Sequence, residues 1–191
     1  MMKRSILFLI LLVGGGCVSP SSRITLEDTA RSIHSKNGGG EYGLYFRDLQ
    51  DGETLEISAE VSFLDPKGRR LSILGRVLEE LSAGRVSWES VQVDLEKMIR
   101  EGDSDAGVRL ISRFGRDAEV FLSPRSTGHL IEGIFDQDHP PEIQEFLEAH
   151  SKGLGRFQNH SGRFYMLILF QKGAGNPERE LAIHSYMESK S

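Results

Sequence analysis

The residues of this chain that could perform chemistry lie at the starts of two expected helices in its middle third. Lys67-Gly-Arg-Arg70 follows Asp65-Pro66, a candidate N-cap and N1 proline, and Gly102-Asp103-Ser104 precedes an apolar helical stripe. A protonated ammonium is not a nucleophile, and a guanidinium does not release its proton near neutral pH. These residue types therefore favour a small anion-binding patch, or a solvated basic surface, over covalent catalysis.

The basic tetrad is expected to need carboxylates nearby. Lys67, Arg69 and Arg70 would fall in the first turn of the helix, where the helix dipole opposes each cation by about 0.3 to 1 kcal/mol. We expect Asp65 to cap this helix and Asp103 to lie within reach of Lys67 or Arg70. Asp103 also suits a second role, because an aspartate at such a turn can cap the helix that follows it.

Other catalytic and metal-binding arrangements have little support in the sequence. No two histidines are four residues apart and the chain has a single cysteine, so no metal ligand and no cofactor is assigned. The sequence contains no Gly-x-Ser-x-Gly elbow and no phosphate loop. A Ser-His-Asp triad stays open, because its members meet only in space. His160 and Ser161 are neighbours where a hairpin turn is expected, which favours a turn over a catalytic pair.

The first residues have the pattern of an export signal. Lys3 and Arg4 precede an apolar run, Ile6 to Val13, which ends in three glycines and Cys17. A permanent transmembrane helix needs about 20 apolar residues, so this run is too short. The segment resembles a bacterial lipoprotein signal, in which the cysteine is lipidated and becomes the new N-terminus. An ordinary cleaved signal with an incidental Cys17 is the alternative.

The sequence predicts three segments, which are a lipoprotein-type signal peptide at 1–16, a tether at 17–24 and one folded domain at 25–191. Removing residues 1–16 takes away Lys3 and Arg4, so the formal net charge of −5 becomes −7. An acidic chain without basic or aromatic clusters argues against nucleic acid as a partner. The lone cysteine excludes a disulfide within the chain.

Strand patterns occur at both ends of the predicted domain. Residues 42–47 and 53–58 flank Asp51-Gly52, a strong turn signal, and should form an antiparallel hairpin. Residues 164–170 are apolar on both faces, as a strand between two helical layers must be. We expect these three strands to share one antiparallel sheet, because strands at the two ends of a domain can bury their faces only by meeting.

Helical periodicity occupies the middle of the chain and both of its flanks. A first helix should start at Thr25, whose hydroxyl and Asp28 resemble a capping box, and a closing helix should run from about Pro177 to Met187. The apolar spacing between the strands predicts further helices at 71–84, 91–99, 106–114, 124–135 and 141–147. The order of the elements therefore predicts an α+β fold with a central helical cluster.

This order of elements, together with the stretches at 67–70 and 102–104, resembles the penicillin-recognising serine hydrolases, meaning class A β-lactamases and penicillin-binding transpeptidases. In active members the nucleophile lies in Ser-x-x-Lys at the start of the first core helix. Phe63, four residues before the serine position, and Val77-Leu78 give one register, in which serine has become Lys67 and lysine has become Arg70. The resemblance thus implies the fold but a lost nucleophile and base.

The other motifs of the resemblance are also altered. Ser-Asp-Asn, which supplies a hydroxyl for proton shuttling and an amide for the substrate, corresponds to Gly102-Asp103-Ser104. Lys-Thr-Gly on the inner strand has no clear counterpart, and His160-Ser161-Gly162 is the nearest string. The region between Gly115 and Ser123 is too short for the loop that carries the water-activating Glu of class A enzymes. The catalytic positions are therefore assigned no active residue.

The sequence thus predicts an exported, lipid-anchored and catalytically inactive β-lactamase-like protein that binds a partner in the cell envelope. The partner would be an envelope protein or a peptidoglycan-related ligand, and the membrane would be reached through the lipid anchor on Cys17. Possible ligand-binding residues are Lys67, Arg70, Asp103, His160 and Ser161. Two alternatives remain, which are a divergent serine hydrolase that uses non-standard residues and an unrelated small lipoprotein.

Overall fold

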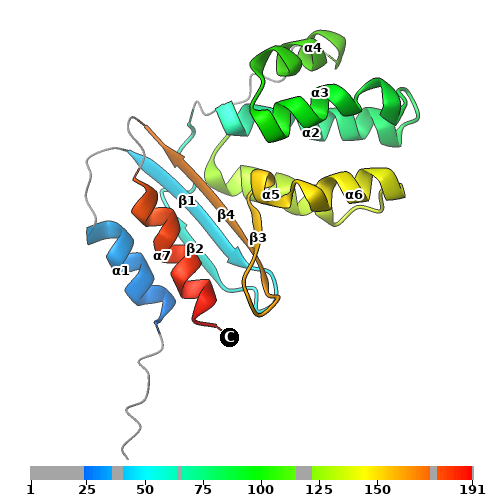
Figure 1. Cartoon of the computed structure of the whole chain (residues 1–191). Coiled ribbons are helices and arrows are strands. Elements are labelled where there is room, and N and C mark those ends of the chain that lie inside the picture. The colour runs from blue at the N-terminus through cyan, green and yellow to red at the C-terminus, as the bar shows by residue number, and fades with distance from the viewer. Residues whose placement is uncertain (1–23, 36–40, 64–65, 115–121, 173–175, 191) are drawn as a thin grey trace, which may run out of the picture.

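The computed structural model describes residues 24–35, 41–63, 66–114, 122–172 and 176–190, and Figure 1 shows their arrangement. The predicted signal peptide and Cys17 lie outside the described residues, as does Asp65. Seven α-helices lie in these ranges: α1 (Leu26–Ser35), α2 (Pro66–Ser82), α3 (Gln92–Glu96), α4 (Ser104–Phe114), α5 (Pro124–Phe135), α6 (Pro141–Ala149) and α7 (Pro177–Glu188). None of the helices in these ranges is long and apolar enough to cross a membrane.

The strands form one antiparallel sheet that joins the two ends of the chain. They are β1 (Tyr42–Asp48), β2 (Thr54–Ile57), β3 (Arg156–Gln158) and β4 (Phe164–Gln171), in the order β2-β1-β4-β3. Every neighbouring pair is antiparallel, and Leu44 of β1 pairs with Leu169 of β4. The predicted hairpin, with Gly52 at φ 71°, and the single sheet built from both ends are therefore confirmed.

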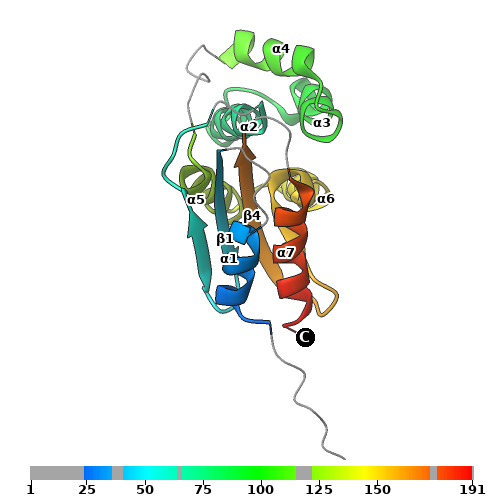
Figure 2. The ribbon, with the colours of Figure 1, turned by 90° about the vertical axis from the view of Figure 1, so that its left-hand side faces the viewer.

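The two faces of the sheet pack against different helices, as Figures 1 and 2 show. Tyr165 and Leu167 lie in a core with Ile33 of α1 and Ile183 of α7. The alternate residues of β4 face a second core that belongs to the central helices and contains Met166, Ile168 and Phe170. Because a strand turns successive side chains to opposite faces, β4 must be apolar throughout to fill both cores.

The central helices are held together by α2 and joined to the sheet by α5. Leu74 and Val77 of α2 are fully buried in the helical core, together with Leu95 and Leu110 from the neighbouring helices. α5 begins as predicted, because the Ser123 hydroxyl accepts a hydrogen bond from the Ser126 amide at 3.2 Å and Pro124 takes the first helical position. The predicted helical cluster and α+β class are confirmed.

One helix differs from its prediction. Residues 91–99 were expected as one continuous stripe, but the chain forms a 3-10 turn at Trp88–Ser90, then α3, then a π-helical turn at Lys97–Glu101. The amide of Asp103 donates to the carbonyl of Lys97 at 3.1 Å, which closes this wide turn. Leu95, Met98 and Ile99 still face the core, so the apolar spacing identified the buried face but not the helix type.

Candidate functional site

The start of α2 is placed by Phe63, which connects the sheet to the helical cluster. The Phe63 amide donates to the carbonyl of Leu122 at 3.2 Å, in an isolated antiparallel bridge just before α5. The Phe63 ring lies 6.0 Å from the ring of Phe170 on β4. Gly43 of β1 gives this ring room, since a Cβ at that position would lie 2.7 Å from its edge. The basic tetrad therefore begins beside the ends of β1 and β4.

The structure brings Arg70 and Gly102 into contact, although they are far apart in the sequence. A Cβ built on Gly102 would lie 3.0 Å from Nη2 and 3.2 Å from Nη1 of Arg70. Gly102 has φ 72°, a left-handed conformation that favours glycine. The guanidinium thus occupies the space that a side chain at position 102 would need. Lys67 belongs to the first turn of α2, but its side chain lies outside the described part.

Asp103 has a structural role at the start of α4. Its Oδ1 accepts hydrogen bonds from the amides of Asp105 at 2.8 Å and Ala106 at 3.2 Å. These hydrogen bonds, first that of Ala106 and then that of Asp105, lower the pKa of the Asp103 carboxyl. Ser104 is the first residue of α4. The predicted capping role of Asp103 is therefore observed, because its carboxylate accepts from two amides of the first turn of α4.

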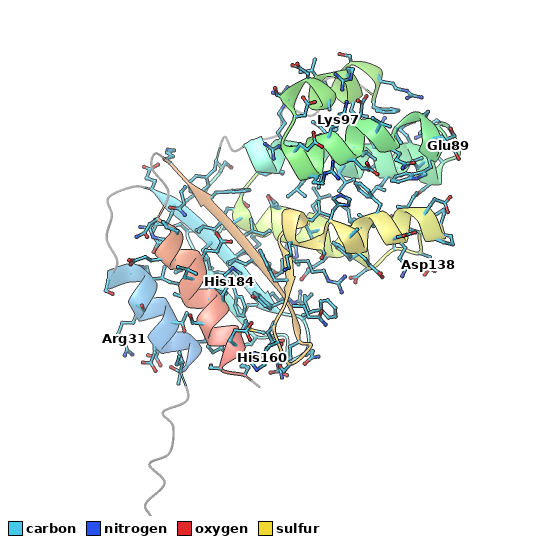
Figure 3. The ribbon with its side chains drawn as sticks, in the orientation of Figure 1. Arg31, Glu89, Lys97, Asp138, His160 and His184 are labelled. Atoms are coloured by element: carbon cyan, nitrogen blue, oxygen red, sulfur yellow. The ribbon has the colours of Figure 1, made fainter. Side chains whose placement is uncertain are left out.

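His160 and Ser161 lie in the turn between β3 and β4, where Gly162 has φ 85°. Nδ1 of His160 contacts the carboxylate of Glu188, and the Ser161 hydroxyl donates to Oδ1 of Asn159 at 2.9 Å. Figure 3 shows His160 beside the end of α7, while Lys97, the first residue of the π turn, lies in the helical cluster. The structure therefore does not bring His160 and Ser161 to Arg70 and Asp103, and their positions fit the turn interpretation.

A cluster of charged groups around one buried carboxylate, at one end of the sheet, was not assigned from the sequence. Asp48 is fully buried, and its Oδ2 accepts from Arg163 and from Lys190, each at 2.8 Å. Burial alone would raise the pKa of Asp48, but hydrogen bonds from Lys190, from the amides of the turn and from Arg163 outweigh it and lower the pKa to about 2. This cluster joins three chain segments. The only feature of the sequence that could have indicated it is Asp48, a charged residue at the end of an otherwise mostly apolar strand.

The same cluster includes Tyr186 and Glu53. The Tyr186 hydroxyl donates to Oε2 of Glu53 at 2.5 Å, and Lys190 reaches the same oxygen at 2.5 Å. Burial and the bond to Glu53 raise the pKa of Tyr186 to about 12. Every charged group here has a partner of opposite sign, which is the arrangement of a structural ion network. Within the described ranges, no group of three His, Cys, Asp or Glu residues could hold a metal ion.

Comparison with known proteins identifies the fold. No protein-family model matches the sequence, and no curated protein matches it. Among solved structures, a mutant of PBP-A in an acyl-enzyme complex with penicillin G superposes with a TM-score of 0.68 at 14% identity, covering 88% of this chain and 96% of that one.

Two β-lactamases superpose on this chain to a similar extent. The enzyme from Sphaerobacter thermophilus has a TM-score of 0.68 at 12% identity and covers 87% of this chain and 97% of its own. The class A β-lactamase from Mycobacterium abscessus has a TM-score of 0.62 at 13% identity and covers 85% and 97%. At such identities the likeness shows the fold alone. The chain therefore has the α+β fold shared by class A β-lactamases and PBP-A.

Proposed function

We propose that this protein is an exported, lipid-anchored and catalytically inactive relative of the β-lactamase-like serine hydrolases that binds a partner in the cell envelope. The observation that supports inactivity is the contact between Arg70 and Gly102. In the register of the resemblance these are the positions of the lysine base and of the serine that shuttles protons. Their contact in the fold supports that register, because the two positions would have to meet in an active enzyme.

The residues at these positions lack the groups that acyl transfer needs. A guanidinium stays protonated near neutral pH and cannot accept a proton from a nucleophile. Gly102 has no hydroxyl, and the Asp103 carboxylate is engaged with the amides of α4. Position 67, which would carry the nucleophile, is a lysine. A base, a proton shuttle and a nucleophile are thus replaced together, which supports a binding function over hydrolysis.

The replaced residues also fit one another sterically. A guanidinium is larger than an ammonium, and it lies in the space that loss of the serine side chain leaves open. Restoring the serine alone would push its Cβ against Nη2 of Arg70. Arg70 and Gly102 therefore fit each other without a serine at position 102. We propose that the fold is maintained for a role that does not require turnover.

Penicillin G tests the inactivity, because it acylates the PBP-A mutant of the same fold. Intact-protein mass spectrometry of the parent after incubation with penicillin G should show no added penicilloyl mass, and a chromogenic β-lactam should not be hydrolysed above an unfolded control. A class A β-lactamase treated in parallel validates the reagents. A covalent adduct on the parent would establish the divergent-hydrolase alternative instead.

The double substitution Lys67→Ser with Arg70→Lys tests how complete the loss is. We expect it to remain inactive toward the chromogenic β-lactam, because it still lacks the inner-strand motif and the water-activating Glu, and Gly102 provides no hydroxyl for the proton shuttle. The triple variant that adds Gly102→Ser restores this hydroxyl, and its turnover is compared with that of the double variant. Turnover by the double variant would show that the site needs only two residues and that the parent is close to an active enzyme.

The anchor is proposed from the short apolar run and the single cysteine of the sequence. Cys17→Ala should move the protein from the membrane fraction to the soluble fraction of cells that process bacterial lipoproteins. Cys17→Ser is a second variant with a side chain of similar size. If both variants fractionate with membranes as fully as the parent does, the anchor at Cys17 is wrong.

A further inference from the structure

Two exposed apolar side chains lie close together at the outer side of the helix pair α1 and α7. Ile24 is 45% exposed and Leu181 is 59% exposed, and both line one shallow groove of about 250 Å³. The remaining residues that line the groove are small or polar: Asp28, Thr29, Ser32, Ala182 and Ser185. We call this surface the α1–α7 face. It is separate from Arg70 and Gly102, which belong to the helical cluster.

The sequence places the proposed anchor next to this face. Six residues separate Cys17 from Ile24, and an extended chain spans at most about 3.6 Å per residue, so the reach is about 25 Å. This is about the length of α2, whose 17 residues rise about 1.5 Å each. A lipid on Cys17 therefore keeps the start of α1 within about one helix length of the bilayer.

The helical cluster lies at the other end of the molecule. Figures 1 and 2 both place the first turn of α1 at the end of the molecule opposite α2, α3 and α4. A short connection restrains the part of the domain nearest to it and leaves the far part remote from the bilayer. Of the surfaces beside this connection, the α1–α7 face offers the two exposed apolar side chains, and such side chains are favoured at a lipid interface.

We infer that the α1–α7 face lies against the lipid surface, so that the helical cluster with Arg70 and Gly102 points away from it. This inference rests on the proposed anchor at Cys17. It assigns the membrane surface as the occupant of the groove, and it presents the altered catalytic region to partners in the aqueous envelope.

The charge of the face indicates that the tether, and not intrinsic affinity, maintains this contact. Glu27 and Asp28 lie in the first turn of α1, and Arg31 forms ion pairs with both, at 3.3 Å and 3.1 Å. Asp28 is the only charged residue of the face itself, and with Glu27 and Arg31 beside it two carboxylates stand against one guanidinium, so the excess charge is negative and an anionic lipid surface repels it. The domain released by Cys17→Ala should consequently show no binding to vesicles, whereas the lipidated protein should lie with this face down.

Fluorescence quenching by lipids tests the orientation. Leu181→Cys and Val93→Cys are matched variants, because Leu181 on α7 and Val93 on α3 are both 59% exposed. Cys17 is the only native cysteine, so in the lipidated protein the introduced thiol alone takes up a fluorophore. In vesicles that contain nitroxide-labelled lipids, the probe at 181 should lose fluorescence and the probe at 93 should not.

The outcomes separate the two proposals. If the parent and Cys17→Ala fractionate alike, the anchor fails and the orientation fails with it. If the parent is anchored but the two probes are quenched alike, or the probe at 93 more strongly, only the orientation is wrong. A third outcome is that the probe at 181 is unquenched although the protein is anchored, and that the protein in detergent has twice the mass of one chain. That outcome would assign the face to a second copy of the chain. Circular dichroism of both cysteine variants confirms that they fold.

Discussion

At the scale of single residues, the contact of Arg70 with Gly102 depends on a conformation and on a volume. The left-handed φ of 72° favours glycine whatever lies nearby, and the guanidinium at 3.0 Å removes the space for a Cβ. Gly52 separates these two effects, since it has φ 71° but no atom within 4 Å of a built Cβ. Comparing the same substitution at Gly52 and at Gly102 therefore isolates the steric cost of the contact with Arg70.

We expect Gly102→Ala to lower the free energy of unfolding by about 2 to 4 kcal/mol, of which about 1 to 2 kcal/mol is the cost of the left-handed backbone. Gly52→Ala should show only that backbone cost. Arg70→Ala, combined with Gly102→Ala, should recover the difference as a coupling energy of about 1 to 2 kcal/mol in a double-mutant cycle. Urea unfolding followed by circular dichroism measures the parent and all four variants. Equal costs at the two glycines would show that Arg70 can move away freely.

At the scale of elements, α5 sets the distance between the helical cluster and the sheet. Gly128 of α5 faces the Tyr45 ring of β1, and a Cβ there would lie only 2.4 Å from the ring edge. Gly133 lies one to two turns further along the same helix and has no atom within 4 Å of a built Cβ. The helix can approach the sheet this closely because position 128 has no side chain.

We expect opposite effects when these two glycines are replaced. Gly133→Ala should stabilise the protein by about 0.5 to 1 kcal/mol, because alanine loses less backbone entropy in a helix and meets no neighbour. Gly128→Ala should destabilise it by about 1 to 3 kcal/mol, because the helix or the Tyr45 ring must shift. The midpoints of thermal and urea unfolding report both changes. A stabilising Gly128→Ala would mean that the ring has room to turn aside.

At the scale of the whole molecule, the ion network around Asp48 closes the fold. Asp48 ends β1, Arg163 precedes β4 and Lys190 follows α7, so the network ties the hairpin to the last residues of the chain. The amides of Gln50 and Asp51 also donate to Oδ1 of Asp48, at 2.9 Å and 3.3 Å. A buried carboxylate with several donors is costly to protonate or to remove.

The network predicts how stability depends on acid. In the folded protein the hydrogen-bond donors around Asp48 outweigh its burial and lower the pKa of its carboxyl from the ordinary 3.8 to about 2. A lowered folded pKa gives stability that is present above about pH 4 and is lost as the pH falls through about 2. Asp48→Asn should therefore cost about 3 kcal/mol at pH 7 and flatten the pH dependence between pH 4 and pH 2.

Asp51→Asn is the control for this prediction, because Asp51 contacts the same two cations but its side chain is 54% exposed. Its loss should cost less than about 1 kcal/mol, as for other exposed ion pairs. Urea midpoints at pH 7, 4, 3 and 2 compare the three proteins. If the stabilities of the parent and of Asp48→Asn fall in parallel as the pH is lowered, carboxylates other than Asp48 cause the loss of stability in acid.

The sequence predicted the elements whose local chemistry is strong. The turn at Asp51-Gly52, the Ser123-Pro124 cap and the doubly apolar strand at 164–170 each depend on near neighbours, and the structure has all three. β3 was missed because Arg156–Gln158 is only three residues long and shows no clear alternation. The π turn before Gly102 was missed because its apolar spacing is still compatible with an α-helix.

The candidate site could be predicted only in part, for a different reason. Arg70 and Gly102 are 32 positions apart in the sequence, so no periodicity places them together. Their pairing came from the register of a resemblance, and the packing of α2 against the π turn then brought them into contact. The network around Asp48 combines residues from three distant segments, which single-sequence reasoning cannot join.

The sheet that unites both ends of the chain also affects how the protein must be made. Leu44 pairs with Leu169, a separation of 125 residues, and β1 and β4 are the two central strands. A ribosome adds about 5 to 20 residues per second, so β1 waits at least about 6 s for its partner strand. Such long-range pairing also makes folding intrinsically slow. A nascent chain of this topology stays without its central sheet until β4 has been synthesised, which would leave time for the proposed export in an unfolded state.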